Sequence, residues 1–456
     1  MSHFLTKALS HYNATPKRSL SFNNIARMAT ASTVQLSRRR KLQFSAPDLA
    51  SDATQTTSKL LQDNHDQHHI FFNQQGFHNH IAHHLLTIFA LGATPKELEQ
   101  QYASNQDYQR PLHRSTSVQN LVFEDEAAIM AHLCQGRYYP DFLAFFQSEI
   151  SKSSWQEVLQ KYLLSGTALA ETLFVRLWSS IYHPLIHLGF AIESAQPALV
   201  AEALAETAVH DAWIGHYLKP AEAAANVHRD GPSKSIVELI EAMHSDQTLR
   251  DAVRWSDSSM LRDGVISRAG ERMVGYASQY HLQPTDDLMY KTAEMISAVA
   301  YFTGGAQRDD FEPNLNSSIF FSAFLEQDWL SDANKRRLLE WKVWNDLIMY
   351  ASRKAPEPRI DIVRAYKPKH ASDWEGVFDR VKTTPDDGHA AKLVRALAHG
   401  QRVCAPYEDR AEFRLKHDDW LQLGHMAIDS VEAGGPTWVR STGFDEAWEE
   451  VPRAQL

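Results

Sequence analysis

Helical periodicity dominates the sequence from about residue 66 onward. Apolar side chains recur three and four residues apart, whereas alternating β-branched runs joined by Asn-Gly or Asp-Gly turns are scarce. This spacing predicts helices at 80–92, 139–150, 154–164, 167–193, 198–218, 235–244, 287–302, 334–352 and 384–400. Because no change in composition separates these segments, we expect one all-α domain over residues 66–456, a large multi-helix bundle.

Composition sets the limits of what this bundle can be. The chain has 456 residues, 43% of them hydrophobic and 22% charged, which is enough apolar material for a large core. Its 46 basic and 56 acidic residues give a net charge of −10, so we expect no nucleic-acid partner. The two cysteines, Cys134 and Cys404, exclude a disulfide framework and a cysteine-based zinc site. No apolar run is long enough to cross a bilayer, and the oligomeric state cannot be read from the sequence.

The first 65 residues differ from the rest of the chain. No Asp or Glu precedes Asp48, whereas Lys and Arg are frequent and Ser, Thr and Ala fill the spaces between them. An Arg-rich, Ser-rich and acid-free segment is typical of a mitochondrial transit peptide, and a disordered basic leader explains it equally well. We therefore expect residues 1–65 to lie outside the fold, and a cytoplasmic or mitochondrial location.

Several familiar catalytic motifs are missing. The sequence has no GxGxxG after a strand, so a Rossmann-type site for a nicotinamide has no visible anchor. It also lacks GxxxxGK[ST], HExxH and a GxSxG with hydrolase context. Any chemistry must therefore come from its 23 histidines.

Pairs of potential metal ligands share helical faces at three places in the chain. The pairs are His80 with His84, His183 with His187, and His389 with Lys392. Imidazole is the commonest metal ligand, and bundles build metal sites from inward-facing side chains on several helices. The alternative is that each histidine bonds a backbone carbonyl in the core, as most buried polar groups do. For three apolar helices taken together, a metal site in a central histidine-lined pocket becomes competitive.

The helix predicted at 384–400 has well-marked ends. Thr384 is placed to serve as its N-cap, Pro385 suits the first helical position, and Gly400 suits its end. The acids at 386–387 complement the positive end of the helix dipole. On residue type alone, Lys392 one turn further along is a solvated surface lysine.

A second metal-binding reading rests on the dipeptide His210-Asp211. It resembles the HD pair of metal-dependent phosphohydrolases. The dipeptide is common by chance, and no matching set of ligands stands before or after it in the sequence. A metal-dependent phosphohydrolase is therefore only an alternative hypothesis.

Five segments resemble the fungal questin oxidase-like family. They are FHNHIAHHLLTIFALGA (77–93), YHPLIHLGFAIE (182–193), ALVAEALAETAVH (198–210), LLEWKVWNDLIMYASRKAPE (338–357) and DDGHAAKLVRALAHG (386–400). The resemblance extends from about residue 70 to 432. It implies an oxidoreductase that oxygenates and opens an anthraquinone ring in a polyketide pathway, with an aromatic polyketide and O2 as partners. One branch uses a Baeyer–Villiger step with NADPH, and another a dioxygenase-type cleavage at non-haem iron.

The resemblance also implies a ligand set. In the iron-dependent branch, four histidines and a carboxylated lysine hold Fe(II), and the matching residues here are His80, His183, His389 and Lys392. A carboxylated lysine forms when the neutral amine captures CO2 and becomes an anionic oxygen ligand. This resemblance implies that His389 and Lys392 are the catalytic residues. It implies that His84 and His187 support the ligands or line the substrate pocket.

One departure from the family pattern weakens this reading. The family has a Met-His before the stretch that here reads NSSIFFSAFLEQDWLS (316–331), but residues 308–318 contain no histidine. Either His84 or His187 takes the fourth place, or the site is weakened. A helical scaffold or binding protein that has lost its metal is therefore the alternative from another class.

Aromatic residues offer a wall for a flat substrate. They are Trp178, Tyr182, Phe190 and Trp213. Such residues more often fill a core than line a pocket, so both readings stay open.

Overall fold

The computed structural model describes residues 28–113, 123–305, 312–433, 439 and 441–449, and the regular secondary structure of these residues is helical, with isolated bridges but no strand. The prediction of an all-α bundle is confirmed. In the N-terminal half the helices are α1 (Ser51–Gln67), α2 (Ile81–Ala90), α3 (Pro95–Gln106), α4 (Glu126–His132), α5 (Tyr139–Lys152), α6 (Trp155–Leu159), α7 (Ala168–Arg176), α8 (Ser179–Ser194), α9 (Pro197–Val209) and α10 (Gly215–His228). The later ones are α11 (Ile236–Ser245), α12 (Gln247–Asp251), α13 (Ser267–Ala277), α14 (Leu288–Gly305), α15 (Glu312–Leu325), α16 (Asp332–Ser352), α17 (Ile360–Ala365), α18 (Trp374–Thr383), α19 (His389–Cys404) and α20 (His417–Glu432). Five short 3-10 or π segments are η1 (Gly136–Tyr138), η2 (Gln160–Leu164), η3 (Met260–Ile266), η4 (Ala405–Tyr407) and η5 (Asp445–Trp448).

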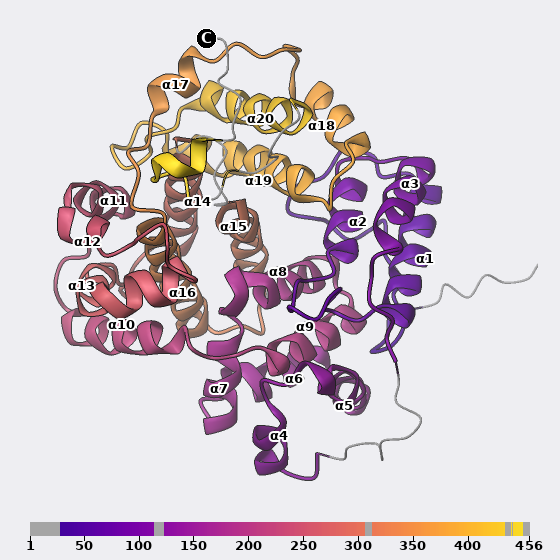
Figure 1. The fold of residues 1–456 in the computed structure, drawn as a ribbon. Coiled ribbons are helices and arrows are strands. Elements are labelled where there is room, and N and C mark those ends of the chain that lie inside the picture. Colours follow the sequence, from indigo (N-terminus) through magenta and orange to yellow (C-terminus); the bar gives the residue numbers. More distant parts are fainter. Residues whose placement is uncertain (1–27, 114–122, 306–311, 434–438, 440, 450–456) are drawn as a thin grey trace, which may run out of the picture.

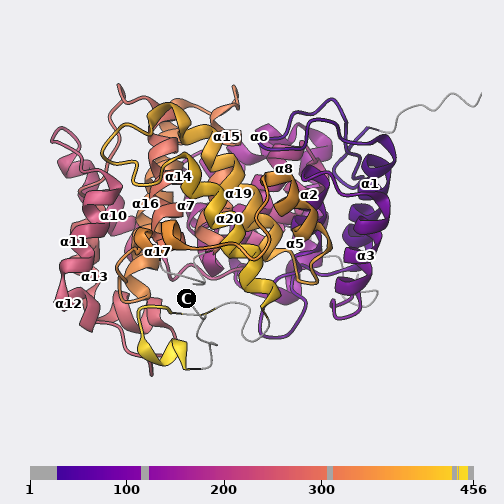
Figure 2. The same ribbon diagram turned by 90° about the horizontal axis from the view of Figure 1, so that it is seen from above.

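Helix α8 lies at the centre of the bundle. It packs against α9 and α15, and α15 in turn packs against α14 and α19. Figures 1 and 2 show α1–α3 at one end of the molecule and α10–α13 at the other, with α18–α20 along one side. The buried hydrophobic residues form one continuous cluster from Ala31 to Phe444, so the described helices share a single core.

Two segments predicted as single helices are broken in the structure. The segment 167–193 divides into α7 and α8, and 198–218 divides into α9 and α10. The first break leads into a left-handed backbone at Ser180, Ile181 and Tyr182, with φ of 49°, 54° and 65°. Apolar periodicity runs through both breaks because each half buries the same face, so the periodicity alone could not locate them.

The helix predicted at 384–400 begins and ends later than expected. It runs from His389 to Cys404, and Thr384 instead follows the end of α18. Asp386, not Thr384, caps the new helix, because its carboxylate accepts from the backbone N–H of Gly388 at 2.7 Å and of Ala390 at 2.8 Å. Gly400 lies inside the helix, where a Cβ would stand 2.3 Å from the Trp420 ring, so close packing rather than a helix end requires this glycine.

The folded part begins well before residue 66. Helix α1 buries Leu60 and Leu61, and Val34 is buried ahead of it. Arg40 binds the backbone carbonyl of Glu193 at 2.7 Å, which fastens this segment to the end of α8. The boundary predicted at residue 65 therefore moves towards the N-terminus, because the basic segment supplies apolar side chains and arginines to the core.

Two predictions fall outside the described residues. Residues 1–27 of the acid-free leader are outside the described residues. So are residues 308–311, part of the stretch that lacks the family's histidine. The cytoplasmic or mitochondrial location stays a prediction.

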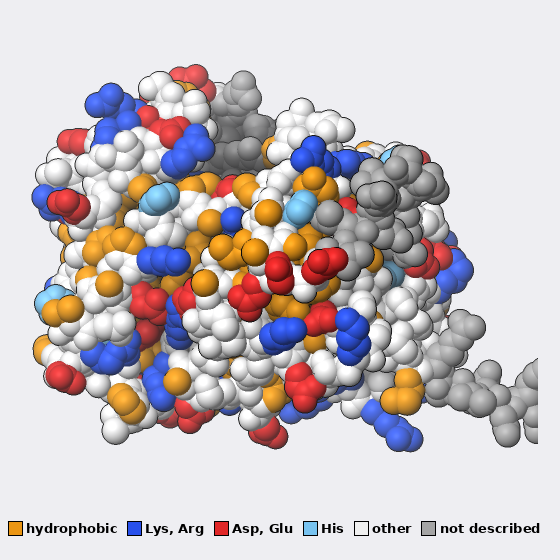
Figure 3. Space-filling model, turned by 90° about the horizontal axis from the view of Figure 1, so that it is seen from below, with side chains coloured by type: hydrophobic (Ala, Val, Ile, Leu, Met, Phe, Trp, Pro, Cys, Tyr) orange, Lys and Arg blue, Asp and Glu red, His pale blue; other side chains and the backbone are white. Residues whose placement is uncertain are grey.

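The surface carries mixed charge. On the face viewed from below in Figure 3, Lys and Arg side chains are interspersed with Asp and Glu, around hydrophobic groups that cross the middle of the face. Such a face creates no strong field of one sign. None of the described helices combines the length and apolar character required to cross a bilayer.

Candidate metal centre

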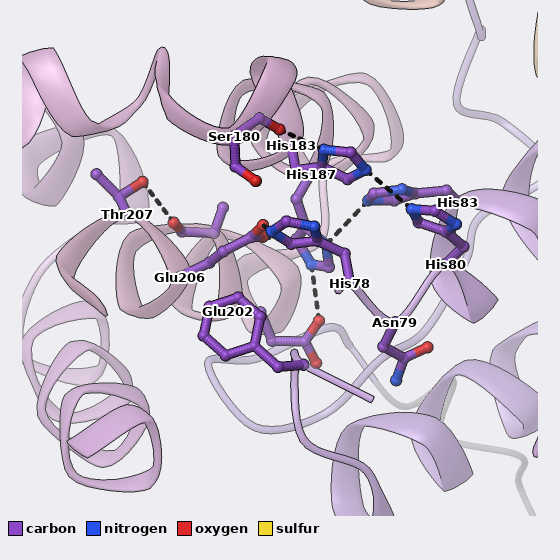
Figure 4. Close-up of polar contacts among 12 residues, drawn as sticks. His78, Asn79, His80, His83, Ser180, His183, His187, Glu202, Glu206 and Thr207 are labelled. Carbon is purple, nitrogen blue, oxygen red and sulfur yellow. Dashed lines mark hydrogen bonds and ion pairs between the residues drawn. The ribbon is translucent and has the colours of Figure 1, made fainter. Parts of the chain in front are cut away.

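Three of the histidines predicted from the sequence come together in the interior. His80 caps the start of α2, His183 lies in α8, and His389 is the first residue of α19. The ring centres of His80 and His183 are 5.1 Å apart, and those of His80 and His389 are 4.7 Å apart. Figure 4 shows His80 and His183 facing each other. Long-range packing therefore unites segments from three parts of the chain.

Asp387 orients two of these rings. His80 Nδ1 donates to one carboxylate oxygen of Asp387 at 2.8 Å, and His389 Nδ1 donates to the other. Burial alone raises the pKa of Asp387, but His389 and His80 outweigh it and hold the pKa well below its usual range. Asp387 therefore stays ionised, and the neutral ring of His80 keeps its proton on Nδ1 and presents a lone pair on Nε2.

His183 has the same tautomer for a different reason. Its Nδ1 donates to the backbone carbonyl of Ser180 at 2.6 Å, which leaves Nε2 as a lone pair. That atom lies 2.9 Å from His80 Nε2. Burial, followed by the charge of Lys392, lowers the pKa of His80 to about 4, and burial lowers the pKa of His183 well below its usual value. At neutral pH no proton is available to bridge the two lone pairs, and a metal cation would resolve their repulsion.

Lys392 lies against this centre. Its side chain is buried, with 3% of the residue exposed, one turn after His389. After burial, its charge is among the causes that lower the pKa of His80, His83 and His183. The reading of Lys392 as a solvated surface residue is therefore wrong.

Gly388 brings the start of α19 close to α2. Its φ of 95° belongs to the left-handed region that glycine adopts most readily. A Cβ on this residue would lie 2.7 Å from the Cβ of His84. Both features require glycine, and together they place Asp387 and His389 beside the first turn of α2.

A strained turn precedes His183. Three consecutive non-glycine residues, Ser180 to Tyr182, have left-handed backbone angles, each of which costs roughly 1–2 kcal/mol. Tyr182 is fully buried, and its hydroxyl donates to Asp346 at 2.6 Å. The same carboxylate is held by Lys342, one turn earlier on α16. This buried pair stabilises the turn that sets the direction of His183.

A closed hydrogen-bond network lies beside the three rings. His187 Nε2 donates to Glu202 at 2.8 Å, and His187 Nδ1 lies 3.1 Å from His83 Nε2. The other oxygen of Glu202 binds His65 Nδ1, whose second nitrogen meets Gln147 at 3.0 Å. Burial raises the pKa of Glu202, but hydrogen bonds from His187 and His65 lower it to about 2. Both nitrogens of His187 are used by protein groups, so this predicted neighbour of the site is not available to a metal without rearrangement.

A third group contains His78, Glu206 and His210. The Nε2 atoms of His78 and His210 are 2.8 Å apart, and Glu206 Oε1 lies 3.4 Å from the first and 3.8 Å from the second. Burial raises the pKa of Glu206 to about 8. The His210-Asp211 dipeptide does not act as a pair, because the ring of His210 turns to His78 while Asp211 accepts from Ser179.

Sequence reasoning missed five residues of these groups. They are His65, His78, Glu202, Glu206 and Asp387. The glutamates had a usable signal, since two acids one turn apart stand in the otherwise apolar run ALVAEALAETAV. Asp387 was noted only for its effect on the helix dipole, and nothing local distinguishes it from Asp386.

A cavity of about 160 Å³ lies on the other side of the strained turn. Ser180 and Ile181 line it together with Trp178, Trp213 and Arg353. Two of the four aromatic residues expected to form a flat pocket are therefore present in its wall. Phe190 instead stacks on the ring of His83.

Comparisons with known proteins place the chain among fungal oxidoreductases. The profile described as questin oxidase-like matches residues 77–397. The Baeyer–Villiger monooxygenase dmxR6 of Cryptosporiopsis sp. (strain 8999) is 38% identical over 422 residues, which cover 88% of this chain and 94% of that protein. The oxidoreductase AflY of Aspergillus parasiticus is 38% identical over 84% of this chain and 80% of its own length. The questin oxidase of Aspergillus fumigatus is 35% identical over 93% of this chain and all of its own.

Proposed function

The chain belongs to the questin oxidase-like family of oxidoreductases that act with oxygen, and we propose that it oxygenates and cleaves the ring of an anthraquinone-type aromatic polyketide at a non-haem Fe(II). The names of its relatives, a questin oxidase and several Baeyer–Villiger oxidases, support the reaction class. The proposal that iron is bound rests on the arrangement of side chains in this protein.

One observation is the main support for a bound metal. The rings of His80 and His183 each donate their Nδ1 proton to an oxygen acceptor, which leaves two Nε2 lone pairs 2.9 Å apart, and the ring of His389 lies beside that of His80 with centres 4.7 Å apart. An acceptor behind the ring is how proteins orient metal-binding histidines. Imidazole nitrogens suit iron as well as zinc and copper, and the family resemblance selects iron among them.

Lys392 supplies the oxygen ligand in this proposal. Its neutral amine adds to CO2, one amine proton leaves, and the resulting carbamate carries a negative charge. The side chain of Lys392 is buried at the centre, and a bound cation favours the anionic carbamate over the free amine. The proposed ligand set is therefore His80, His183, His389 and carboxylated Lys392.

Fe(II) in such a site supplies a centre at which O2 is bound and reduced. The protein's own groups keep that centre dry and oriented: Asp387 holds two rings in one tautomer, and the Tyr182–Asp346 bond holds the turn before the third. The cavity beside this turn offers flat walls from Trp178 and Trp213. Arg353 in the same wall supplies a positive charge for a phenolate or quinone oxygen of the substrate.

The two routes named by the resemblance differ in electron balance. A Baeyer–Villiger insertion places one oxygen atom in the product and reduces the other to water with two electrons from NADPH. A dioxygenase-type cleavage places both atoms in the product and consumes no NADPH. The ratio of NADPH to O2 consumed with an anthraquinone substrate therefore separates them, with one expected for the first route and zero for the second.

The lack of a histidine at 308–318 bears on the ligand count. His187 is committed to Glu202 and His83, whereas His84 is buried and its Nε2 has no hydrogen-bond partner among the described residues, so His84 is the candidate for the fourth place beside three histidines and the lysine. A coordination position is then left for O2, substrate or water. The metal-free scaffold is the alternative, and it predicts a folded protein without bound iron.

Substitution of Lys392 tests the proposal. Lys392→Ala removes the carbamate, so bound iron should fall to a small fraction of the wild-type content and O2 uptake with an anthraquinone should be lost. Lys392→Glu offers a carboxylate on a shorter arm and should restore part of the iron. Bicarbonate should raise the activity of wild-type protein prepared without CO2, and should do nothing for either variant.

Lys382→Ala is the matched control. Lys382 stands on α18, where its partly buried side chain pairs with the exposed Asp379, and it belongs to none of the histidine groups, so its loss should leave iron content and O2 uptake unchanged. If Lys392→Ala kept both its iron and its activity, the carbamate assignment would be wrong. Folded wild-type protein that remains iron-free after anaerobic incubation with Fe(II) would instead favour the scaffold.

A further inference from the structure

His78, Glu206 and His210 bring three donor atoms together outside the ligand set proposed above. His78 comes from the loop before α2, Glu206 from the last turn of α9, and His210 from the residue that ends α9. Their donor atoms all lie within 4.8 Å of one another. All three residues are buried, with exposed fractions of 5%, 1% and 8%. Two imidazoles and a carboxylate are a donor set that zinc and ferrous iron both accept.

The two buried glutamates of α9 show why hydrogen bonding alone does not account for this group. Glu202 and Glu206 stand one turn apart, and each is almost fully buried. Glu202 has a close histidine partner on each oxygen, at 2.8 Å for His187 and closer still for His65. Glu206 Oε2 has no hydrogen-bond partner among the described residues, and Oε1 meets its two histidines only at 3.4 and 3.8 Å. Glu206 is therefore an open carboxylate in the interior.

An open buried carboxylate needs a proton or a cation. A protonated Glu206 would have to place its proton on a neighbour, and the contacts from Oε1 are longer than ordinary hydrogen bonds. The 2.8 Å separation of the two Nε2 atoms shows that both rings already turn the same nitrogen towards this point. A divalent ion held by these three atoms would satisfy the carboxylate and both nitrogens at once.

We propose that His78, Glu206 and His210 form a second site for a divalent transition metal, beside the site for iron. This site goes beyond the proposed function, because none of its three side chains takes part in the first ligand set. The two sites are adjacent: the ring of His78 stacks on that of His183, with centres 3.9 Å apart and planes at 13°. Figure 4 shows this stack, with Glu206 on the far side of His78 from His80. A cation bound at the edge of His78 stabilises the ring against which His183 packs.

The experiment isolates the second site by removing the first. Metal-free protein carrying both Lys392→Ala and His389→Ala is titrated with Zn²⁺ alone, because three histidines by themselves can hold zinc. Bound metal is measured by elemental analysis after gel filtration, together with the melting temperature. We expect one Zn²⁺ per chain and a rise in melting temperature on binding. Adding Glu206→Gln keeps the shape of the side chain but removes its charge, and should weaken Zn²⁺ binding at least about tenfold and abolish the rise.

A hydrogen-bonding role for Glu206 makes the opposite prediction. The amide of Glu206→Gln would then leave Zn²⁺ binding unchanged, and that result would overturn the proposal, as would a double variant, Lys392→Ala with His389→Ala, that binds no Zn²⁺. His210→Asn provides a second loss-of-ligand variant if Glu206→Gln fails to fold. His244→Asn is the matched control, because His244 binds the backbone carbonyl of Ala355 and belongs to neither group.

Failure of this site and failure of the iron site are distinguishable. Wild-type protein should bind two metal ions per chain, His210→Asn one, and the double variant one. If His210→Asn loses metal and the double variant does not, the second site is supported and the iron site is contradicted. Loss only in the double variant does the reverse.

Discussion

The Asp387 centre and the Glu202 network are built from the same parts but end differently. In both, a buried or partly buried carboxylate binds two histidine rings through its two oxygens: Asp387 binds His80 and His389, and Glu202 binds His65 and His187. Around Glu202 the second nitrogen of each ring also meets a protein group. Around Asp387 the second nitrogen of His80 meets only the lone pair of His183.

The difference shows that the far nitrogen decides the role of a carboxylate–histidine pair. Where a protein donor or acceptor satisfies it, the pair stabilises the fold and has no capacity for a ligand. Where it faces another lone pair, as at His80, we propose that a cation binds between the two nitrogens. Four substitutions test this distinction, beginning with the largest expected effect.

Glu202→Ala should destabilise the protein by about 3–5 kcal/mol, because it leaves two buried histidines without their charged partner. Metal content should stay near wild type in whatever fraction remains folded. Urea unfolding measures the free energy, with exposed Glu241→Ala as the control, expected within about 0.5 kcal/mol of wild type. A loss below about 1 kcal/mol would show that the closed network contributes little to stability.

Asp387→Asn should weaken metal binding by about 10–100-fold, since an amide has one acceptor oxygen where two rings each require one. Its effect on unfolding should be smaller than that of Glu202→Ala. Metal affinity is measured by competition with a chelator. Asp386→Asn, one residue earlier, removes one of the two acceptor oxygens at the start of α19 and should lower stability slightly without changing metal affinity. Equal affinities for the two variants would contradict the proposed role of Asp387.

Tyr182→Phe should cost about 1.5 kcal/mol of stability and also weaken metal binding, because the turn before His183 loses its hydrogen bond to Asp346. Tyr217→Phe is the matched control. It also removes a buried hydroxyl, but this one donates to the backbone carbonyl of Trp344 at 2.9 Å and not to Asp346. Both variants should melt earlier, and only Tyr182→Phe should bind metal less tightly.

His399→Leu should have the smallest effect, and it depends on pH. His399 is buried, and neither of its ring nitrogens has a hydrogen-bond partner among the described residues. Burial, with Arg402 and Arg395, lowers its pKa to about 3. The unfolded state takes up a proton below about pH 6.5 and the folded state does not until about pH 3, so stability from this residue is lost as the pH falls between these values.

The leucine variant lacks that proton uptake. Between pH 7 and pH 5.5 its free energy of unfolding should therefore fall by about 1 kcal/mol less than that of the wild type. Urea unfolding at the two pH values gives the comparison. Parallel losses in the two proteins would show that His399 is protonated, or paired, in the folded state.

The fold could be anticipated further than the site. Helical spacing placed α2, α5, α11, α14 and α16 nearly where they lie, because periodicity records which face each helix buries. It could not show the break at Ser180–Tyr182, since a left-handed turn of non-glycine residues has no local preference in its favour and depends on Asp346 from α16. Thr384 and Gly400 failed as helix ends for a related reason: tertiary contacts at Gly388 and Trp420 outweighed ordinary capping preferences.

Within the site, residue type predicted the functional side chains better than their spacing did. Histidines on apolar helices had to find partners in the interior, and that requirement marked His80 and His183 before any contact was known. It did not distinguish His187, whose two ring nitrogens both meet protein groups, from His183, whose Nε2 faces the Nε2 of His80. Both stand on the same helix four residues apart, and only the groups facing them differ.

The sequence by itself determined that this protein is all-α, and it predicted that the chemistry depends on histidine and that residues 77–93 and 386–400 contribute to one site. The first two conclusions rest on local spacing and on the cost of burying unpaired polar groups, and the third rests on the resemblance to the questin oxidase-like family. Only the tertiary structure decided that Asp387 orients His80, from a position 307 residues away in the chain. No local pattern encodes a contact at that separation, because it depends on how α2, α8 and α19 pack around a common core.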